Sequence, residues 1–436
     1  MRIICQLLCL CALLLWPAHS AAKAVSLSSD NFVLSGNISE DKGQELLEDL
    51  ELFRESLFHL MGAKALGEPV PVKIYAAKND KEIGQISGER GFGGLYTRSH
   101  KGPSLLINSK TGFGRKNKGG GGARHIALHE YSHHLFNMHI PYGLPRWYNE
   151  GLADYLATFT YKNGVFHIGK PYETAMAALG AGDWLPIETI LNSVNAYPFE
   201  GEEGALNQSF AAQKFYAQSW LMVHYIQSRK DYRALIENYA ARVMSGEDSP
   251  AAFEAVFNLS PQAFEDKLRS YYKQGDYETR IFSRPPSPLP SVKRETLSRA
   301  QLQLAKLSAR ADFSQGRSRA AGAIEAIEKY ERKYKPSAQS LILKADLAEL
   351  TSEAVDAEEA FEAAYGFIQS ALAQEPDNLE AKLSAARLIM RAQSLGIDIT
   401  SAQRALARGY VEQVLGEYPN HRFGRALQRL ILAQAP

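Results

Sequence analysis

Cysteine is almost missing from this sequence. The 436 residues contain three cysteines, and all of them, Cys5, Cys9 and Cys11, lie in an apolar stretch near the N-terminus. The residue before each one is bulky, which argues against a lipid-attachment site. If this stretch is removed on export, the mature chain cannot form a disulfide. Its stability must then come from core packing and from bound metal.

The sequence also lacks an excess of charge of either sign. Lys and Arg number 49, Asp and Glu number 48, and the formal net charge is +1. A chain without a basic excess has no general means of holding a nucleic-acid backbone or an anionic membrane surface. We therefore expect no nucleic-acid partner.

No apolar run is long enough to anchor the chain in a bilayer. The run from Ile3 to Trp16 falls short of the ~20 residues that span a membrane. It follows Met1 and Arg2 and precedes Pro17 to Ala22, where small residues suit signal-peptidase cleavage. We expect a signal peptide over residues 1–21, a secreted or periplasmic bacterial protein, and no stable membrane span after cleavage.

Hydrophobic spacing predicts an α+β domain with a small mixed sheet over residues 25–282. The strand candidates are 31–34, 69–75 and 104–108. The helix candidates are 46–60, 213–228, 232–244 and 264–272. Glycines in 88–94 lack the spacing of a phosphate-binding loop. The segment 112–122, which contains RKNKGGGG, is expected to be a flexible loop, either a connector or a flap over a cleft.

A proline-rich linker is expected at 283–292, because Arg284 to Pro290 has too many prolines for a helix. From there to residue 436 the chain is rich in Ala, Leu, Glu and Gln, and we expect an all-helical domain over 293–436. Prolines at 336, 376 and 419 mark similar helix ends 40 and 43 residues apart. This regularity resembles a divergent tetratricopeptide-type solenoid, and an ordinary helical bundle is the alternative. Either would suit an interaction module that binds a protein partner, or a packing module.

The motif HEYSH carries the clearest chemistry in the sequence. His129 and His133 are four residues apart on a predicted helix, so their imidazoles project from one face. Two neutral imidazoles fill half of the tetrahedral sphere of zinc (Zn2+). Glu130 is rotated by ~100° from His129 and suits a general base. A separate apolar stripe of Leu128, Tyr131 and Leu135 is expected to anchor the helix to the core.

A second block, PRWYNEGLADYLA, follows shortly after HEYSH. HExxH followed by NEGLAD resembles the gluzincin branch of zinc peptidases, the thermolysin-like clan. The resemblance implies a zincin-like domain, with Glu150 as third zinc ligand and Asp154 supporting a ligand histidine. PRWYNEGLADYLA and FYAQSWLMVHYI are similar to bacterial peptidase-MA-like proteins, often paired with helical repeats, over roughly residues 31–272.

Four further residues are candidates for the site. His125 and His134 are alternative ligands by position, although supporting or surface roles are favoured. Tyr216 and His224 lie on a later helix, and each is a candidate to donate a hydrogen bond to the oxyanion of a tetrahedral intermediate. We prefer Tyr216.

The expected activity is zinc-dependent hydrolysis of peptide bonds, with Glu130 as the base that activates water. The strand at 104–108 is expected to pair with an extended peptide or protein substrate. No GxMEN-type segment is present, which favours an endopeptidase over an aminopeptidase. The rival hypothesis is a catalytically inactive scaffold whose helical tail binds a protein partner.

Overall fold

The computed structural model describes residues 25–62, 68–89, 93–111, 122–140, 142–198, 205–351 and 357–433. The expected signal peptide, its three cysteines and nearly all of the glycine-rich loop 112–122 lie outside the described residues. Within these ranges, none of the helices combines the length and the apolar character needed to cross a bilayer.

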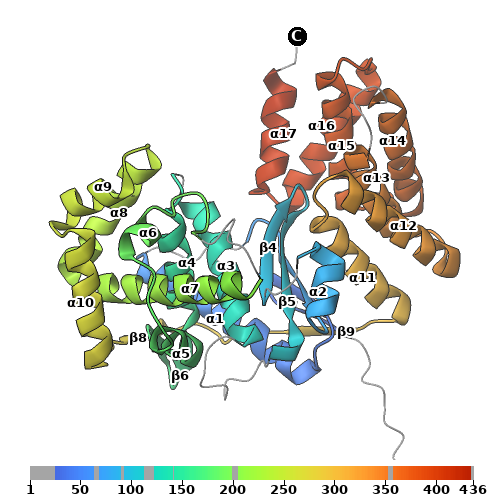
Figure 1. Cartoon of the computed structure of the whole chain (residues 1–436). Coiled ribbons are helices and arrows are strands. Elements are labelled where there is room, and N and C mark those ends of the chain that lie inside the picture. The colour runs from blue at the N-terminus through green and yellow to red at the C-terminus, as the bar shows by residue number, and fades with distance from the viewer. Residues whose placement is uncertain are drawn as a thin grey trace, which may run out of the picture.

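A mixed sheet lies near the centre of the fold (Figure 1). It has six strands, in the order β4-β5-β3-β2-β1-β9. Its strands are β1 (Val25–Ser28), β2 (Phe32–Gly36), β3 (Val72–Ala77), β4 (Gly94–Ser99), β5 (Gly102–Asn108) and β9 (Lys293–Thr296). β3 pairs in parallel with β2 and β5, and the remaining pairs are antiparallel. The expected α+β class and mixed sheet are therefore confirmed, and β2, β3 and β5 match the three strand candidates.

Helices of the first 282 residues pack around this sheet and around a small antiparallel sheet of β6 (Thr160–Lys162), β7 (Val165–Ile168) and β8 (Arg280–Ser283). The helices are α1 (Glu40–Leu60), α2 (Asp80–Ser87), η1 (Ser109–Thr111), α3 (Ala123–His139), α4 (Arg146–Ala157), α5 (Glu173–Gly180), α6 (Ile187–Leu191), α7 (Ala205–Gln227), α8 (Lys230–Met244), α9 (Ser249–Phe257) and α10 (Pro261–Gln274). One continuous apolar core joins α1, α3, α4, α7 and the sheet. The helix candidates 46–60, 213–228, 232–244 and 264–272 are confirmed by α1, α7, α8 and α10.

The C-terminal part is a succession of helices in which chain neighbours pack side by side. They are α11 (Arg299–Asp312), α12 (Arg317–Tyr334), α13 (Ala338–Thr351), α14 (Ala357–Gln374), α15 (Leu379–Ser394), α16 (Ser401–Glu417) and α17 (Arg422–Ala433). α12, α14 and α16 each end two residues before one of the three spaced prolines.

One expectation about this part is wrong: it is not helical from residue 293. β9 pairs with β1 at the edge of the central sheet, with Lys293 opposite Ser28 and Thr296 opposite Val25. All four side chains of β9 are exposed, so its sequence carries no hydrophobic alternation that would indicate a strand. Backbone pairing with β1 holds it, together with an exposed ion pair of 2.9 Å between Arg294 and Glu40 of α1.

The C-terminal helices stand over one face and one end of the central sheet (Figure 1). Ser104 on β5 donates a hydrogen bond of 2.7 Å to Asp312 on α11. Lys101, buried at the β4–β5 turn, lies 3.1 Å from Asp346 on α13. One contact is a half-buried hydrogen bond and the other is a buried ion pair. The two parts therefore meet through a specific interface.

Candidate metal centre

α3 brings the HEYSH histidines into the interior of the fold. Its apolar stripe is buried as expected, with Leu128 and Tyr131 fully inaccessible and Leu135 nearly so. The Tyr131 ring packs edge-on against Phe32 of β2, with ring centroids 4.9 Å apart. This contact fixes the rotation of α3 about its axis, so His129 and His133 face α4.

α4 carries the NEGLAD motif and is held close to α7. Trp147 is fully buried and donates a hydrogen bond of 3.0 Å from Nε1 to the Tyr239 hydroxyl. Gly151 lies against the backbone of α7, because a Cβ added there would lie only 2.3 Å from the Ser219 carbonyl oxygen. The glycine of the motif thus permits the close approach that positions its neighbour Glu150.

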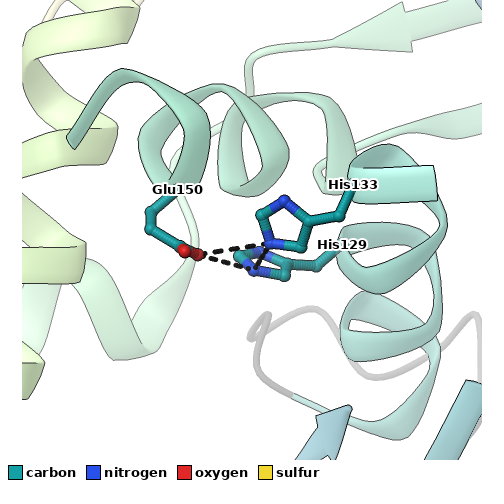
Figure 2. A group of neighbouring side chains, drawn as sticks. All are labelled: His129, His133 and Glu150. Atoms are coloured by element: carbon teal, nitrogen blue, oxygen red, sulfur yellow. Dashed lines mark hydrogen bonds and ion pairs between the residues drawn. The ribbon is translucent and has the colours of Figure 1, made fainter. Parts of the chain in front are cut away.

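Three side-chain atoms converge between α3 and α4 (Figure 2). Nε2 of His129 lies 3.0 Å from Nε2 of His133, and Oε2 of Glu150 lies 3.2 and 3.3 Å from these two nitrogens. Tetrahedral zinc with bonds of about 2.0–2.1 Å separates its ligand atoms by roughly 3.3 Å. The three residues can therefore hold a metal ion, and their spacing fits one of the size of zinc.

The other nitrogen of each histidine is also held. Nδ1 of His129 lies 2.8 Å from Oδ1 of Asp154, and Nδ1 of His133 lies 2.8 Å from Oδ1 of Asn149. Since both oxygens accept, each Nδ1 carries a proton, which leaves Nε2 as the nitrogen of each ring that can bind a metal ion when its own proton is absent. Such outer hydrogen bonds are a regular feature of metal-binding histidines.

Electrostatics favour a cation at this point. Burial alone would raise the pKa of the Glu150 carboxyl, but His133 and His129 hold that pKa far below its usual range. Burial would also raise the pKa of the Asp154 carboxyl. His129 and His125 outweigh this effect, so the pKa of Asp154 is strongly lowered as well. Two buried carboxylates thus remain anionic beside the histidines, and Arg146, 3.9 Å from Oε1 of Glu150, lies on the side of that carboxylate away from the convergence point.

Glu130 lies on α3 between the metal position and the sheet. Its side chain is half-buried against β4, and a Cβ added at Gly94 would lie 3.3 Å from its Cγ. Burial raises the pKa of the Glu130 carboxyl, and the charges of His129 and His133 lower it in part. The carboxyl thus has a proton affinity above that of an ordinary glutamate.

Two tyrosines border the opposite side of the centre. Tyr216 on α7 has its ring centroid 6.4 Å from that of His129 and donates a hydrogen bond of 3.3 Å to the Tyr197 hydroxyl. Tyr197 in turn donates a hydrogen bond of 3.0 Å to Oε1 of Glu150, the oxygen that faces away from the histidines. Sequence reasoning missed Tyr197, because it lies in the irregular segment after α6.

The remaining histidine candidates do not join the three-atom group. Nε2 of His125 lies 3.1 Å from Oδ1 of Asp154, so it supports the centre from behind. His134 faces the other way, with Nε2 3.0 Å from Glu68. His224 is buried in the core beside the Gly169 carbonyl and the Tyr271 hydroxyl, and its proposed role at the oxyanion is therefore wrong.

The expected substrate strand also needs correction. β5, the strand over 104–108, pairs with β3 on one side and β4 on the other, so it has no free edge. Within the part of the chain that the structure describes, β4 ends the sheet next to α3. Its backbone at Gly94 lies beside Glu130, and its outer edge pairs with no other strand in that part of the chain.

Comparisons with known proteins add no relative to this picture. No family model matches the chain, and neither a similar curated protein nor a similar solved structure was found.

Proposed function

We propose that the chain is an exported zinc-dependent peptidase with a zincin-like domain of the gluzincin type. His129, His133 and Glu150 would hold the ion. One observation carries the proposal: both histidines turn Nε2 toward Glu150 while a fixed oxygen holds each Nδ1. A chance HExxH on a surface helix has no reason to show either feature.

The residues around the metal position divide the chemistry between them. Zinc, when bound, supplies Lewis acidity that polarises a substrate carbonyl and lowers the pKa of water. Glu130 accepts a proton from the attacking water and passes it to the leaving amine, a task suited to a carboxyl of raised pKa. The Tyr216 hydroxyl donates to the oxyanion. β4 aligns the peptide backbone beside Glu130.

Metal analysis and proteolysis together test this function. Purified wild type is expected to contain one zinc per chain and to cleave an unfolded protein substrate. Glu130→Gln is expected to keep the zinc and to lose cleavage by about 10²-fold or more, because the amide cannot act as a base. If both proteins hold a full complement of zinc and show no difference in cleavage, the catalytic proposal fails and the inactive scaffold remains as the explanation.

The third ligand has its own test. Glu150→Ala is expected to lose zinc on dialysis against a weak chelator. Glu188→Ala, on the exposed face of α6, removes a carboxylate away from the centre and serves as the matched control. Equal zinc retention by the two variants would exclude Glu150 as a ligand.

A further inference from the structure

A cavity opens at the end of β4, where the C-terminal helices meet the first domain. We call it the basic groove: a cavity of about 390 Å³ bounded by Arg98, His134, Met138, Arg422, Phe423 and Ala426. It lies between the last residues of β4, the C-terminal half of α3 and the beginning of α17. Figure 1 shows α17 standing over this end of β4.

The basic groove lies further along β4 and α3 from the metal centre. β4 and α3 run side by side, with Gly94 against Glu130 and the Tyr96 hydroxyl 3.1 Å from Nδ1 of His134. Two residues further, Arg98 borders the groove together with Met138. Because alternate residues of a strand share a face, Gly94, Tyr96 and Arg98 all lie on the side of β4 that faces α3.

The two arginines of the groove have no carboxylate partner among the residues described. Arg98 is exposed, and Arg422, also exposed, contacts only the Asn137 carbonyl and the Met138 sulfur, both neutral. Glu68 lies at the floor of the groove, but its carboxylate is taken up by Arg54 at 3.2 Å and by His134 and Tyr131. The groove therefore carries a net positive charge.

We propose that the basic groove is a substrate subsite that selects an acidic residue of the peptide, with Arg98 from the sheet and Arg422 from the helical domain as its two cations. The inference rests on the proposed peptidase function and adds the substrate class. It also gives α17 a role in substrate binding, in addition to any partner that the helical tail binds.

The position of the acidic residue follows from strand geometry. Arg98 lies four positions after Gly94 in β4, and a strand rises about 3.3 Å per residue, so the subsite lies roughly 13 Å from the level of Glu130. An extended peptide paired with β4 covers this length with about four residues. Asp or Glu is therefore selected three to five positions from the cleaved bond, on one side only.

The test compares cleavage of a peptide library by wild type, Arg98→Gln, Arg422→Gln and the double variant. Among the peptides that wild type cleaves, Asp and Glu are expected to be enriched at those positions. For a matched pair of peptides, kcat/KM should be higher with Glu than with Gln. Each single variant should reduce that difference about fivefold, as expected for a partly exposed ion pair. The ratio of kcat/KM for the Glu peptide to that for the Gln peptide is taken within each protein, so that a general loss of activity cancels, and added salt should weaken the preference.

Arg429→Gln is the matched control, since it removes an exposed arginine of the same helix away from the groove. An acidic preference that is absent in wild type, or that survives in the double variant, would overturn the inference while leaving peptidase activity intact. If wild type cleaves nothing, the peptidase proposal fails. In that case the groove is tested by the binding of fluorescent Glu and Gln peptides to Glu130→Gln. Equal affinities for the two peptides would contradict the acidic subsite.

Discussion

Oδ1 of Asp154 lies 2.8 Å from Nδ1 of His129, and the hydroxyl of Tyr172 donates to the other carboxylate oxygen at the same distance. His125 adds a third contact at 3.1 Å. A buried carboxylate with partners on both oxygens cannot rotate away from the ring that it supports. Asp154 therefore fixes the direction in which His129 presents Nε2.

Replacing this carboxylate should weaken the metal site without removing a ligand. Asp154→Asn keeps the size of the side chain but removes its charge, and we expect zinc affinity to fall 10- to 100-fold. Competition with a chromophoric chelator measures the change. Tyr172→Phe, which leaves Oδ1 on His129, should have a smaller effect; an unchanged affinity in Asp154→Asn would show that Asp154 does not orient the ligand.

Replacement of Tyr216 and replacement of Tyr197 should have different effects on catalysis and on zinc binding. Burial, with Glu150 as the next contribution, raises the pKa of the Tyr216 hydroxyl well above its usual value, so it stays a hydrogen-bond donor. Tyr216→Phe should lower kcat by about 10²–10³-fold with zinc affinity unchanged. Tyr197→Phe should weaken zinc retention, since it frees one oxygen of Glu150. If Tyr197→Phe lowers kcat and Tyr216→Phe does not, then Tyr197 is the oxyanion donor and Tyr216 is not.

Part of the candidate metal centre could be predicted because the information is local. His129 and His133 share a helical turn, and Glu150 and Asp154 share another, so periodicity places each pair on one face. The prediction that Glu150 joins the two histidines came from the resemblance to gluzincins, not from periodicity. Tyr197 lies 47 positions from Glu150 in an irregular segment, where no period indicates a direction. Only the packing of α7 against α4 brings it to the centre.

The strands show the same division. β2, β3 and β5 have buried, apolar side chains and could be predicted, but their order could not, because strand pairing joins residues far apart in the chain. For this reason the sequence alone points to the strand over 104–108 as the one that pairs with substrate, although β5 is paired on both edges. β4 follows a glycine-rich stretch and β9 is fully exposed, so neither carries a strand pattern.

Gly151 should be indispensable for the geometry of the centre. A methyl group there would meet the Ser219 carbonyl, so Gly151→Ala should push α4 from α7, lower the melting temperature and weaken zinc binding. Gly366 in α14 has open space at its Cβ position, and Gly366→Ala should stabilise the helix by about 0.5–1 kcal/mol. Thermal unfolding of both variants compares them; a tolerated Gly151→Ala would mean that the two helices can separate at little cost.

Glu68 should stabilise the fold in a pH-dependent way. Burial opposes its charge, but His134, Tyr131 and Arg54 lower its pKa from the ordinary value of 4.5 to about 2. A carboxyl with a lowered folded pKa stabilises the protein above pH 4.5, and this contribution is lost as the pH falls toward 2. Its size is about 3 kcal/mol, since one pKa unit corresponds to about 1.4 kcal/mol.

Urea unfolding of wild type and Glu68→Gln between pH 7 and pH 3.5 measures this contribution. The variant should be less stable by about 3 kcal/mol at pH 7, because Arg54 loses its buried partner, and the gap should narrow by about 1.4 kcal/mol per unit below pH 4.5. Glu247→Gln, which breaks the exposed pair with Arg242, should change little at any pH. A gap for Glu68→Gln that stays constant down to pH 3.5 would attribute its effect to packing, since lost packing does not depend on the protonation of the carboxyl.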